Sequence, residues 1–395
     1  MGVASLRTRF AVAGMVCVVV TAWAAGHPLA GPTVSDLPAE LTHAEFWQLS
    51  TDLSERGGEF GSDNLVSNEL SFAQVVPQLH AVVASGGVYL GVGPEQNFTY
   101  LAATRARMGF IVDIRRDNLL LHLMYKALFA MSSSRCMFVS RLFSRVPNCD
   151  SDQASTAADL MNRVDRAEVL RDEAYQRNVQ ELDSVLLKGL ELPLSDTELS
   201  SIRKMYGAFR TYGPAIEYST TLSSRSVSEA TYSNLLKQVD DHGQELSFLA
   251  NDANYQFVKD LHDRNLIVPV VGNFAGSKAI RRIGEYLKDR GATVAAFYVS
   301  NVEDYLGLER APRNPEWRAF CANVAELPLS PASVFVRPLM RARFQPDGSA
   351  AFSHSVEAAA PDSDWIALGV SPAFPSALSF MATEVAPCRA IPQVR

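Results

Sequence analysis

Four short segments of this chain are apolar at almost every position, and this feature constrains the fold more than any other. The segments cover residues 88–92, 109–114, 266–271 and 293–299, and stretches with helical spacing of apolar residues separate them. A strand with one face in water alternates between apolar and polar residues, whereas a strand in a parallel sheet covered by helices is apolar throughout. The sequence therefore predicts an α/β fold with a Rossmann-like, mostly parallel sheet and helices on both of its faces.

The long stretch between the second and third of these segments has a different composition. Residues 150–255 are rich in charged side chains, contain a helix-capping box at 195–198 and show no strand pattern of comparable strength. We therefore expect a helical insertion at 150–255 that divides the Rossmann-like core into a first part, 40–149, and a second part, 256–340. The segment 341–395 is rich in Pro, Ala and Ser, and we expect it to be irregular.

The chain begins with the pattern of an export signal. Arg7 and Arg9 precede an uncharged, mostly apolar stretch that ends at Ala25, and small residues occupy the two positions that a signal peptidase reads. This pattern predicts a signal peptide over 1–24 and a periplasmic or secreted mature protein. The stretch is shorter than the ~20 residues of a membrane span, so a retained N-terminal anchor is the alternative. It is also the only membrane association that we expect.

Charge and cysteine spacing argue against a nucleic-acid site and against a metal site. The formal net charge is −7, and no long basic run occurs, so we expect no binding to nucleic acid. Export would permit disulfides, and the cysteines outside the signal, which allow three full pairings, include no C-x-x-C pair and no Cys/His cluster. We expect Cys136 to be a buried, unreactive residue near a helix end. The four cysteines are Cys136, Cys149, Cys321 and Cys388.

Polar residues and glycines follow the four apolar segments directly. In an open parallel sheet, a ligand binds beyond the carboxyl ends of the strands, close to the point where the strand order reverses. If the four strands are parallel, the residues that follow them meet at one edge of the sheet and form the candidate site. These residues are Gly91, Gly93, Glu95, Asn97, Asp113, Asn273, Tyr298 and Asn301.

The residues after the first two segments suit a nucleoside cofactor. Gly91 and Gly93 allow a tight turn and a close approach of a ligand to the start of the following helix. Asp113 follows Gly93 by 20 residues and ends the next strand, where a carboxylate can accept both hydroxyl groups of a ribose. The alternative is that Arg115 or Arg116, which follow directly, forms a structural ion pair with Asp113. This order of strand, G-x-G, helix, strand and Asp resembles the cofactor half of Rossmann-like folds, including the S-adenosylmethionine-dependent methyltransferases.

The sequence departs from the methyltransferase pattern, acid-x-G-x-G-x-G, at both ends. Tyr89 occupies the position of the leading acid, and Glu95 occupies that of the last glycine. Glu95 would repel the pyrophosphate of a dinucleotide, but it suits the sulfonium cation of S-adenosylmethionine. The alternative is that Gly91 and Gly93 only permit a tight turn from strand to helix.

Several longer motifs resemble an uncharacterised bacterial family that is labelled only as a domain of unknown function. They lie at 62–69, which reads S-D-N-L-V-S-N-E, and at 88–100, 110–118 and 297–306. The resemblance extends over about 42–339. It implies a Rossmann-like core of the methyltransferase type, and it implies no particular activity.

A polar segment precedes the first strand. Its residues Asp63, Asn64, Asn68 and Glu69 are expected to form a lid or a substrate wall, because a preceding segment often folds over the cofactor in such enzymes. A helix cap with an Asx-turn explains the same residue types, and this alternative stays open.

Two functions fit these patterns. The first is an S-adenosylmethionine-dependent methyltransferase of unknown substrate, in which Asp113 holds the ribose and Asn273 or Tyr298 faces the substrate. Methyl transfer needs in-line placement of the nucleophile and the methyl group rather than a triad, so no catalytic residue is assigned. The second is a non-catalytic exported protein that binds another small molecule or a partner in the same pocket. Export favours the second, because S-adenosylmethionine is made in the cytoplasm.

Overall fold

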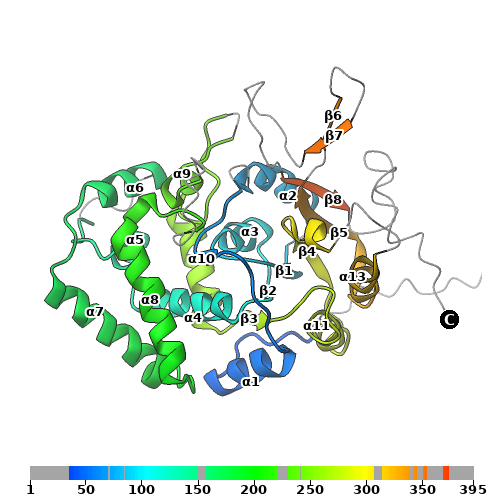
Figure 1. Cartoon of the computed structure of the whole chain (residues 1–395), viewed down its shortest axis with the longest axis horizontal. Coiled ribbons are helices and arrows are strands. Elements are labelled where there is room, and N and C mark those ends of the chain that lie inside the picture. Colours follow the sequence, from blue (N-terminus) through cyan, green and yellow to red (C-terminus); the bar gives the residue numbers. More distant parts are fainter. Residues whose placement is uncertain are drawn as a thin grey trace, which may run out of the picture. The chain divides into compact units, whose positions relative to one another are not determined.

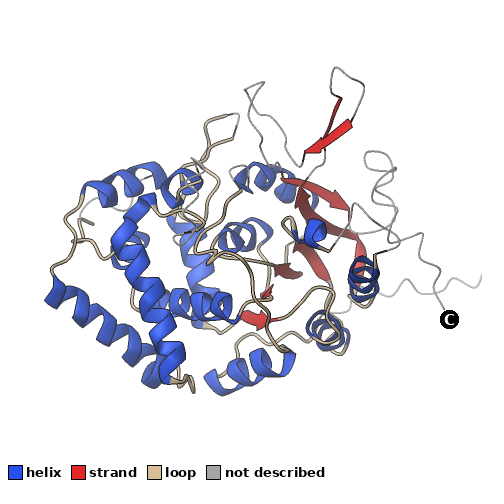
Figure 2. Cartoon of the chain, in the orientation of Figure 1, coloured by secondary structure: helices blue, strands red, loops and turns tan. Residues whose placement is uncertain are grey.

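A six-stranded sheet forms the centre of the fold, and helices cover both of its faces (Figures 1 and 2). The expected signal peptide at 1–24 lies outside the described residues, so it stays a prediction. Within the part of the chain that is described, no helix is long and apolar enough to cross a lipid bilayer. The computed structural model describes residues 35–69, 72–83, 85–149, 156–219, 230–240, 242–306, 314–338, 341–344, 350–353 and 368–372.

The sheet has the strand order β3-β2-β1-β4-β5-β8. Strands β1 to β5 run parallel to their neighbours, and β8 is antiparallel to β5. This arrangement confirms the predicted α/β fold with a mostly parallel sheet, and the four apolar segments all lie in it. The strands are β1 (Val88–Gly91), β2 (Met108–Asp113), β3 (Ile267–Val271), β4 (Val294–Tyr298), β5 (Leu329–Pro338) and β8 (Leu368–Pro372).

Helices form a layer on each face of the sheet (Figure 1). Short helices also lie beside it, with η1 (Phe72–Val75) before α2 and α12 (Val302–Tyr305) after β4. One layer contains α2 (Val76–Val82), α3 (Gln96–Thr104), α4 (Arg116–Ala130) and α10 (Asp252–Asp263), and the other contains α1 (His43–Leu53), α11 (Ala279–Lys288) and α13 (Pro315–Ala325).

Two neighbouring residues of β2 show why its sequence is apolar throughout. Successive side chains of a strand point to opposite faces of the sheet. Gly109 faces α3, since a Cβ atom there would lie 2.8 Å from the Leu101 side chain. Phe110 faces α11, where the centroid of its ring lies 5.8 Å from that of Tyr286. Both faces are therefore covered, and neither leaves room for a polar alternation.

Between β2 and β3, the regular secondary structure of the described residues is helical, apart from isolated bridges, and loops connect the helices. The capping box expected at 195–198 is present, because the Ser195 hydroxyl accepts from the Glu198 N–H and the Glu198 carboxylate accepts from the Ser195 N–H. Besides α4 and α10, this region contains α5 (Arg135–Leu142), α6 (Ala157–Arg166), α7 (Asp172–Ser184), η3 (Val185–Gly189), α8 (Asp196–Tyr212), η4 (Gly213–Ala215) and α9 (Tyr232–Leu236).

An aromatic cluster around Phe98 joins α3 to the helical region. The ring of Phe98 is fully buried and meets its neighbours edge to face, with centroids 5.2–5.7 Å apart. Such pairs contribute about 0.5–1.5 kcal/mol each beyond the area that they bury. The cluster fixes the helix that directly follows the turn after β1. The neighbours are His122, Tyr125, Phe129, Phe248 and His262.

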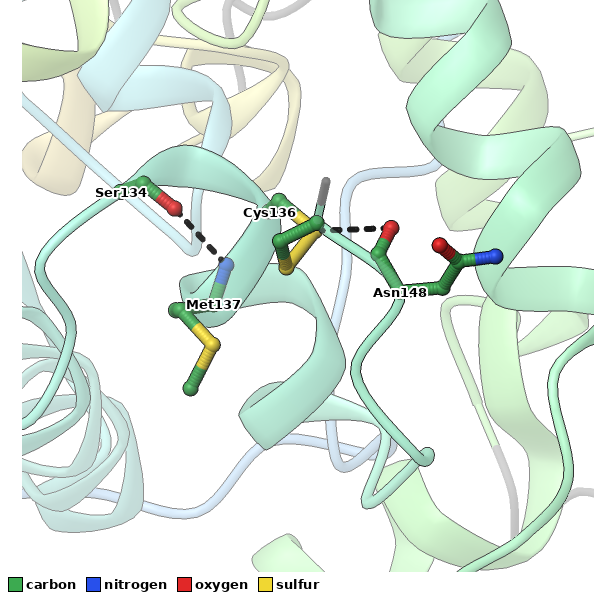
Figure 3. The surroundings of a disulfide bond; sticks show 5 residues. Ser134, Cys136, Met137 and Asn148 are labelled. Carbon is green, nitrogen blue, oxygen red and sulfur yellow. Dashed lines mark hydrogen bonds between the residues drawn. A yellow bond between two sulfur atoms is a disulfide. The ribbon is translucent and has the colours of Figure 1, made fainter. Parts of the chain in front are cut away.

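Cys136 and Cys149 form a disulfide that closes the loop after α5 (Figure 3). The sequence left the pairing of the cysteines open, and it predicted Cys136 to be a buried, unreactive residue. Cys136 is buried, but it is cross-linked rather than a free thiol. The start of α5 is fixed next to it, because the Ser134 hydroxyl accepts from the Met137 N–H at 3.2 Å. Cys321 is also disulfide-bonded.

Strands occur in a part of the chain that the sequence predicted to be irregular. In addition to β8, β6 (Arg341–Phe344) pairs with β7 (Ala350–Ser353) in an antiparallel manner. β8 takes its place by pairing with β5, which ends 30 residues earlier at Pro338. Composition alone gives no signal for such a strand, because the pairing partner rather than the local sequence determines it.

Candidate functional site

A cavity of about 250 Å³ lies at the carboxyl edge of the sheet, beyond β1, β2, β3 and β4. From β1 the chain proceeds to β2 and β3 on one side, whereas β4 and β5 lie on the other side. The strand order therefore reverses at β1, and open α/β sheets bind their ligands at this position. The cavity volume is close to the lower end of the range for small-molecule pockets, ~300–1,000 Å³.

The structure divides the predicted site residues into two groups. Residues that lie in the cavity wall are Gly93, Asp113, Asn64, Asn68, Asn273, Tyr298 and Asn301. Residues that lie outside the wall are Gly91, Glu95, Asn97, Asp63 and Glu69.

Asn97 holds the turn after β1 and leaves space only for glycine at position 91. Its amide group donates to the carbonyl oxygens of 92–94 at 2.7–3.1 Å, and its oxygen accepts from the Tyr89 hydroxyl at 2.7 Å. A Cβ atom on Gly91 would lie 1.9 Å from that oxygen, and Gly93 has a φ of +76° that favours glycine. The hydrogen-bonding capacity of Asn97 is thus used within the turn, so it does not face a ligand.

Glu95 lies in the interior rather than in the cavity wall, so the expectation that it faces a sulfonium is corrected. It is fully buried, and its Oε1 atom accepts from the Ser67 N–H at 3.3 Å while Oε2 has no hydrogen-bond partner. Burial raises the pKa of Glu95 to about 7. The reason lies in the turn, which directs the next side chain, Gln96, into the cavity wall instead.

Asp113 lies in the cavity wall and forms a buried ion pair with Arg115. The Arg115 N–H donates to Oδ1 at 2.8 Å, and Arg115 Nε lies 3.3 Å from the same oxygen. The Gly93 N–H also bonds to this carboxylate, and Arg115 Nη1 donates to the Asp63 carbonyl oxygen at 2.6 Å. Burial raises the pKa of Asp113, and the positive charge of Arg115 opposes that rise.

The segment between α1 and η1, which includes the polar residues 63–69, runs along the carboxyl edge of the sheet. The Glu55 N–H donates to the Val271 carbonyl oxygen at 2.9 Å, and the Gly58 N–H donates to that of Ile114 at 2.8 Å. The Glu55 carboxylate also accepts from the Asn273 N–H at 2.9 Å. These bonds attach the segment to the ends of β2 and β3, so that it forms one wall of the cavity.

Glu69 lies behind the cavity wall and binds two residues that form it. The hydroxyl groups of Tyr298 and Ser300 each donate to one of its carboxylate oxygens. Gln96 Nε2 donates to the Tyr298 hydroxyl at 3.0 Å, and Gln96 Oε1 is buried without a hydrogen-bond partner. Burial raises the pKa of Glu69 to about 6, and the two hydroxyl donors oppose the rise.

The cavity wall also contains residues outside the predicted set, among them Gln96, Arg115 and Ser300. Each lies one or two positions from a residue that was assigned. The ends of the apolar segments locate the site along the chain to within about two positions. They do not indicate which side chain faces the cavity, because the conformation of each turn decides that.

The chain was compared with families and with individual proteins. A family model described as "Domain of unknown function (DUF7790)" matches residues 64–385, which is most of the chain. No curated protein matches the chain significantly. Neither comparison assigns an activity to the chain.

The buried ion pair gives a prediction for stability. The variant Asp113→Asn leaves the charge of Arg115 buried and unpaired. We expect this to lower the unfolding free energy by about 3–5 kcal/mol. The matched control is Asp172→Asn, which breaks the pair with Arg210 at a position where the Asp172 side chain is 84% exposed. We expect the control to cost less than about 1 kcal/mol in urea unfolding. Equal losses in the two variants would contradict the structural role of Asp113.

The position of Glu95 gives a prediction for pH dependence. Its pKa of about 7 lies above the ordinary 4.5, so the folded state keeps the proton to a higher pH than the unfolded state. The protonated Glu95 side chain therefore stabilises the wild type fully below pH 4.5. This contribution to the unfolding free energy, about 3 kcal/mol, is lost as the pH rises to about 7. Glu95→Gln has no carboxyl group to titrate at this position. The difference between its unfolding free energy and that of the wild type should therefore increase by about 3 kcal/mol, in favour of the variant, from pH 4.5 to 7. A difference that is constant with pH would show that Glu95 is not buried as described.

Proposed function

The chain belongs to the DUF7790 family of unknown function, and we propose that it is a methyltransferase. It binds S-adenosylmethionine in the cavity at the carboxyl edge of the sheet and transfers the methyl group to a small substrate. The observation that carries the proposal is an acidic cavity at the position where the strand order reverses. A bound S-adenosylmethionine supplies an activated methyl group, and the chain's own residues orient the acceptor and exclude water.

The charges in the cavity wall favour a ligand without phosphate groups. Arg115 is paired with Asp113, and Glu59 and Glu316 are further carboxylates of the wall. Among the described residues of the wall, no other Lys or Arg is present. A pyrophosphate would meet repulsion here, whereas a sulfonium cation is attracted.

Other atoms of the wall suit a nucleoside. Asp113 Oδ2 accepts from Arg115 Nη2 only over a long 3.4 Å contact, so the carboxylate keeps acceptor sites for a ribose hydroxyl. Gln96 Oε1 is a second free acceptor. Phe60 and Tyr305 line the same cavity with their rings edge to face, 5.3 Å between centroids, and a flat purine packs well on such rings.

We expect adenosylhomocysteine, the product of methyl transfer, to stabilise the protein. At about 100 times the dissociation constant, a ligand that binds only the folded state adds about 2.7 kcal/mol to the unfolding free energy. ATP at the same concentration should have no effect, because the described residues of the wall include no free cation for its phosphates. The measurement is urea unfolding with each nucleoside at about 1 mM, which is 100 times a dissociation constant of about 10 µM.

A pair of variants controls for the place of binding. Asn301→Trp fills part of the cavity and should abolish the stabilisation, whereas Asn162→Trp, on the exposed side of α6, should keep it. If adenosylhomocysteine has no effect on the wild type at millimolar concentration, the methyltransferase proposal fails. If ATP stabilises the protein more than adenosylhomocysteine does, the cavity does not disfavour phosphate groups as its charges predict.

The disulfide favours a second candidate function, that of an exported protein that binds a small molecule or a partner without catalysis. Disulfides form and persist in oxidising compartments, and they are rare in the cytoplasm. The Cys136–Cys149 bond therefore supports the export that the N-terminal pattern predicts. A periplasmic protein would lack a supply of S-adenosylmethionine, and in that case the same cavity would hold another phosphate-free ligand.

Export can be measured directly. Protein isolated from its native cells should fractionate outside the cytoplasm, begin close to Ala25, and keep Cys136 and Cys149 resistant to alkylation until a reductant is added. Cytoplasmic protein that retains Met1 and has alkylatable Cys136 and Cys149 thiols would remove the second candidate and favour the methyltransferase.

A further inference from the structure

We propose that Glu69 is the proton acceptor of the cavity and that Ser300 passes to it the proton of a hydroxyl or amine substrate. This inference rests on the proposed methyl transfer and adds the chemical class of the acceptor. Ser300 lies in the cavity wall, and its Oγ atom is hydrogen-bonded to Glu69 Oε1. Glu69 itself is 1% exposed, so a substrate reaches it only through such a hydroxyl group.

The surroundings of Glu69 favour the uptake of a proton. Among the described residues, no Lys, Arg or His forms an ion pair with it, and its carboxylate accepts from the neutral hydroxyl groups of Tyr298 and Ser300. A buried carboxylate without a cation is held at a free-energy cost, which protonation removes. Its raised pKa, about 6, agrees with this and is close to the range in which a general base works best.

Ser300 is placed for transfer by an unusual backbone. Its φ is +50°, a left-handed value that few residues other than glycine adopt, at the turn between β4 and α12. The turn places one hydroxyl group both in the cavity wall and within hydrogen-bonding distance of Glu69. A serine is needed for this connection, since glycine fits the backbone better but carries no hydroxyl.

Gln96 provides an independent sign that a ligand with a polar hydrogen belongs here. Its side chain is 3% exposed and lines the cavity, and its Oε1 atom has no partner. The orientation of the amide is consistent with the network, because Nε2 donates to Tyr298, whose hydroxyl in turn donates to Glu69. Oε1 can then accept a hydrogen from the substrate and hold it beside Tyr298.

The proton and electron balance of the step is complete. The substrate oxygen or nitrogen forms a bond to the methyl carbon, the carbon–sulfur bond breaks, and its electron pair remains on sulfur. The substrate's proton passes to Ser300 Oγ while the proton of Ser300 passes to Glu69 Oε1. The positive charge of the sulfonium and the negative charge of the carboxylate disappear together, so the reaction leaves no charge in the buried network.

Three tyrosines interact electrostatically with Glu69. Tyr298 and Ser300 bind it, and the charge of Glu69 also acts on Tyr89 of β1 and Tyr100 of α3. Burial raises the pKa of these three tyrosines well above the ordinary value of 10.0, so they stay protonated below pH 8. Glu95 is connected to Glu69 through the backbone and side chain of Ser67, and its own pKa is about 7.

The test uses the mature protein, S-adenosylmethionine and three acceptors on one ring scaffold, namely phenol, benzylamine and benzoate, with adenosylhomocysteine measured by mass spectrometry. We expect turnover with phenol or benzylamine and none with benzoate, which has no proton to transfer. Glu69→Gln and Ser300→Gly should each lower kcat by about 100-fold or more, the range for loss of a general base. The rate of the wild type should rise with pH through about 6, and that of Glu69→Gln should not.

Controls separate this inference from the proposed function. Affinity for adenosylhomocysteine should stay within about threefold in both variants, and Ser300→Gly should fold well because its backbone suits glycine. Glu285→Gln, the same change on the exposed face of α11, should keep the wild-type kcat. If adenosylhomocysteine binds but no hydroxyl or amine acceptor reacts, or if Glu69→Gln retains its rate, the inference is overturned and the binding proposal stands. If adenosylhomocysteine does not bind the wild type, both fail.

Discussion

The ion pair between Asp113 and Arg115 joins three separate segments of the chain at the carboxyl edge of the sheet. Asp113 ends β2 and binds the Gly93 N–H of the turn after β1, while Arg115 reaches the Asp63 carbonyl oxygen in the segment before β1. These partners are far apart in sequence, and the pair holds them around one cavity. Because both side chains are buried, the pair is stable only when it is complete. The cavity and the fold therefore depend on the same interaction.

The helical region between β2 and β3 contributes to this cavity rather than forming a separate body. Tyr218, which follows η4, lies in the cavity wall, and its carbonyl oxygen accepts from the Leu65 N–H at 3.2 Å. On the other side, the aromatic cluster around Phe98 fixes α3 against α4 and α10. The turn after β1 is thus fixed between the sheet and the helices.

The sequence predicted the parts of the structure that local physics determines. Apolar strands covered on both faces are visible in the pattern, and so is the capping box at Ser195, because each depends on residues close in the chain. The direction of the Glu95 side chain is not visible, because it depends on how the turn after β1 is closed by Asn97. The same holds for Glu69, whose partners Tyr298 and Ser300 lie more than 200 residues away, and for β8, which depends on β5.

We propose that the cavity at the reversal of the strand order is a nucleoside site whose polar wall is set by Asp113 and Gln96. A crystal structure of the protein with adenosylhomocysteine tests this proposal most directly. We expect the nucleoside in this cavity, with a ribose hydroxyl on Asp113 Oδ2, a ligand hydrogen on Gln96 Oε1, and the Asp113–Arg115 pair intact. A nucleoside bound elsewhere, or a cavity that stays empty while the nucleoside binds in solution, would contradict it.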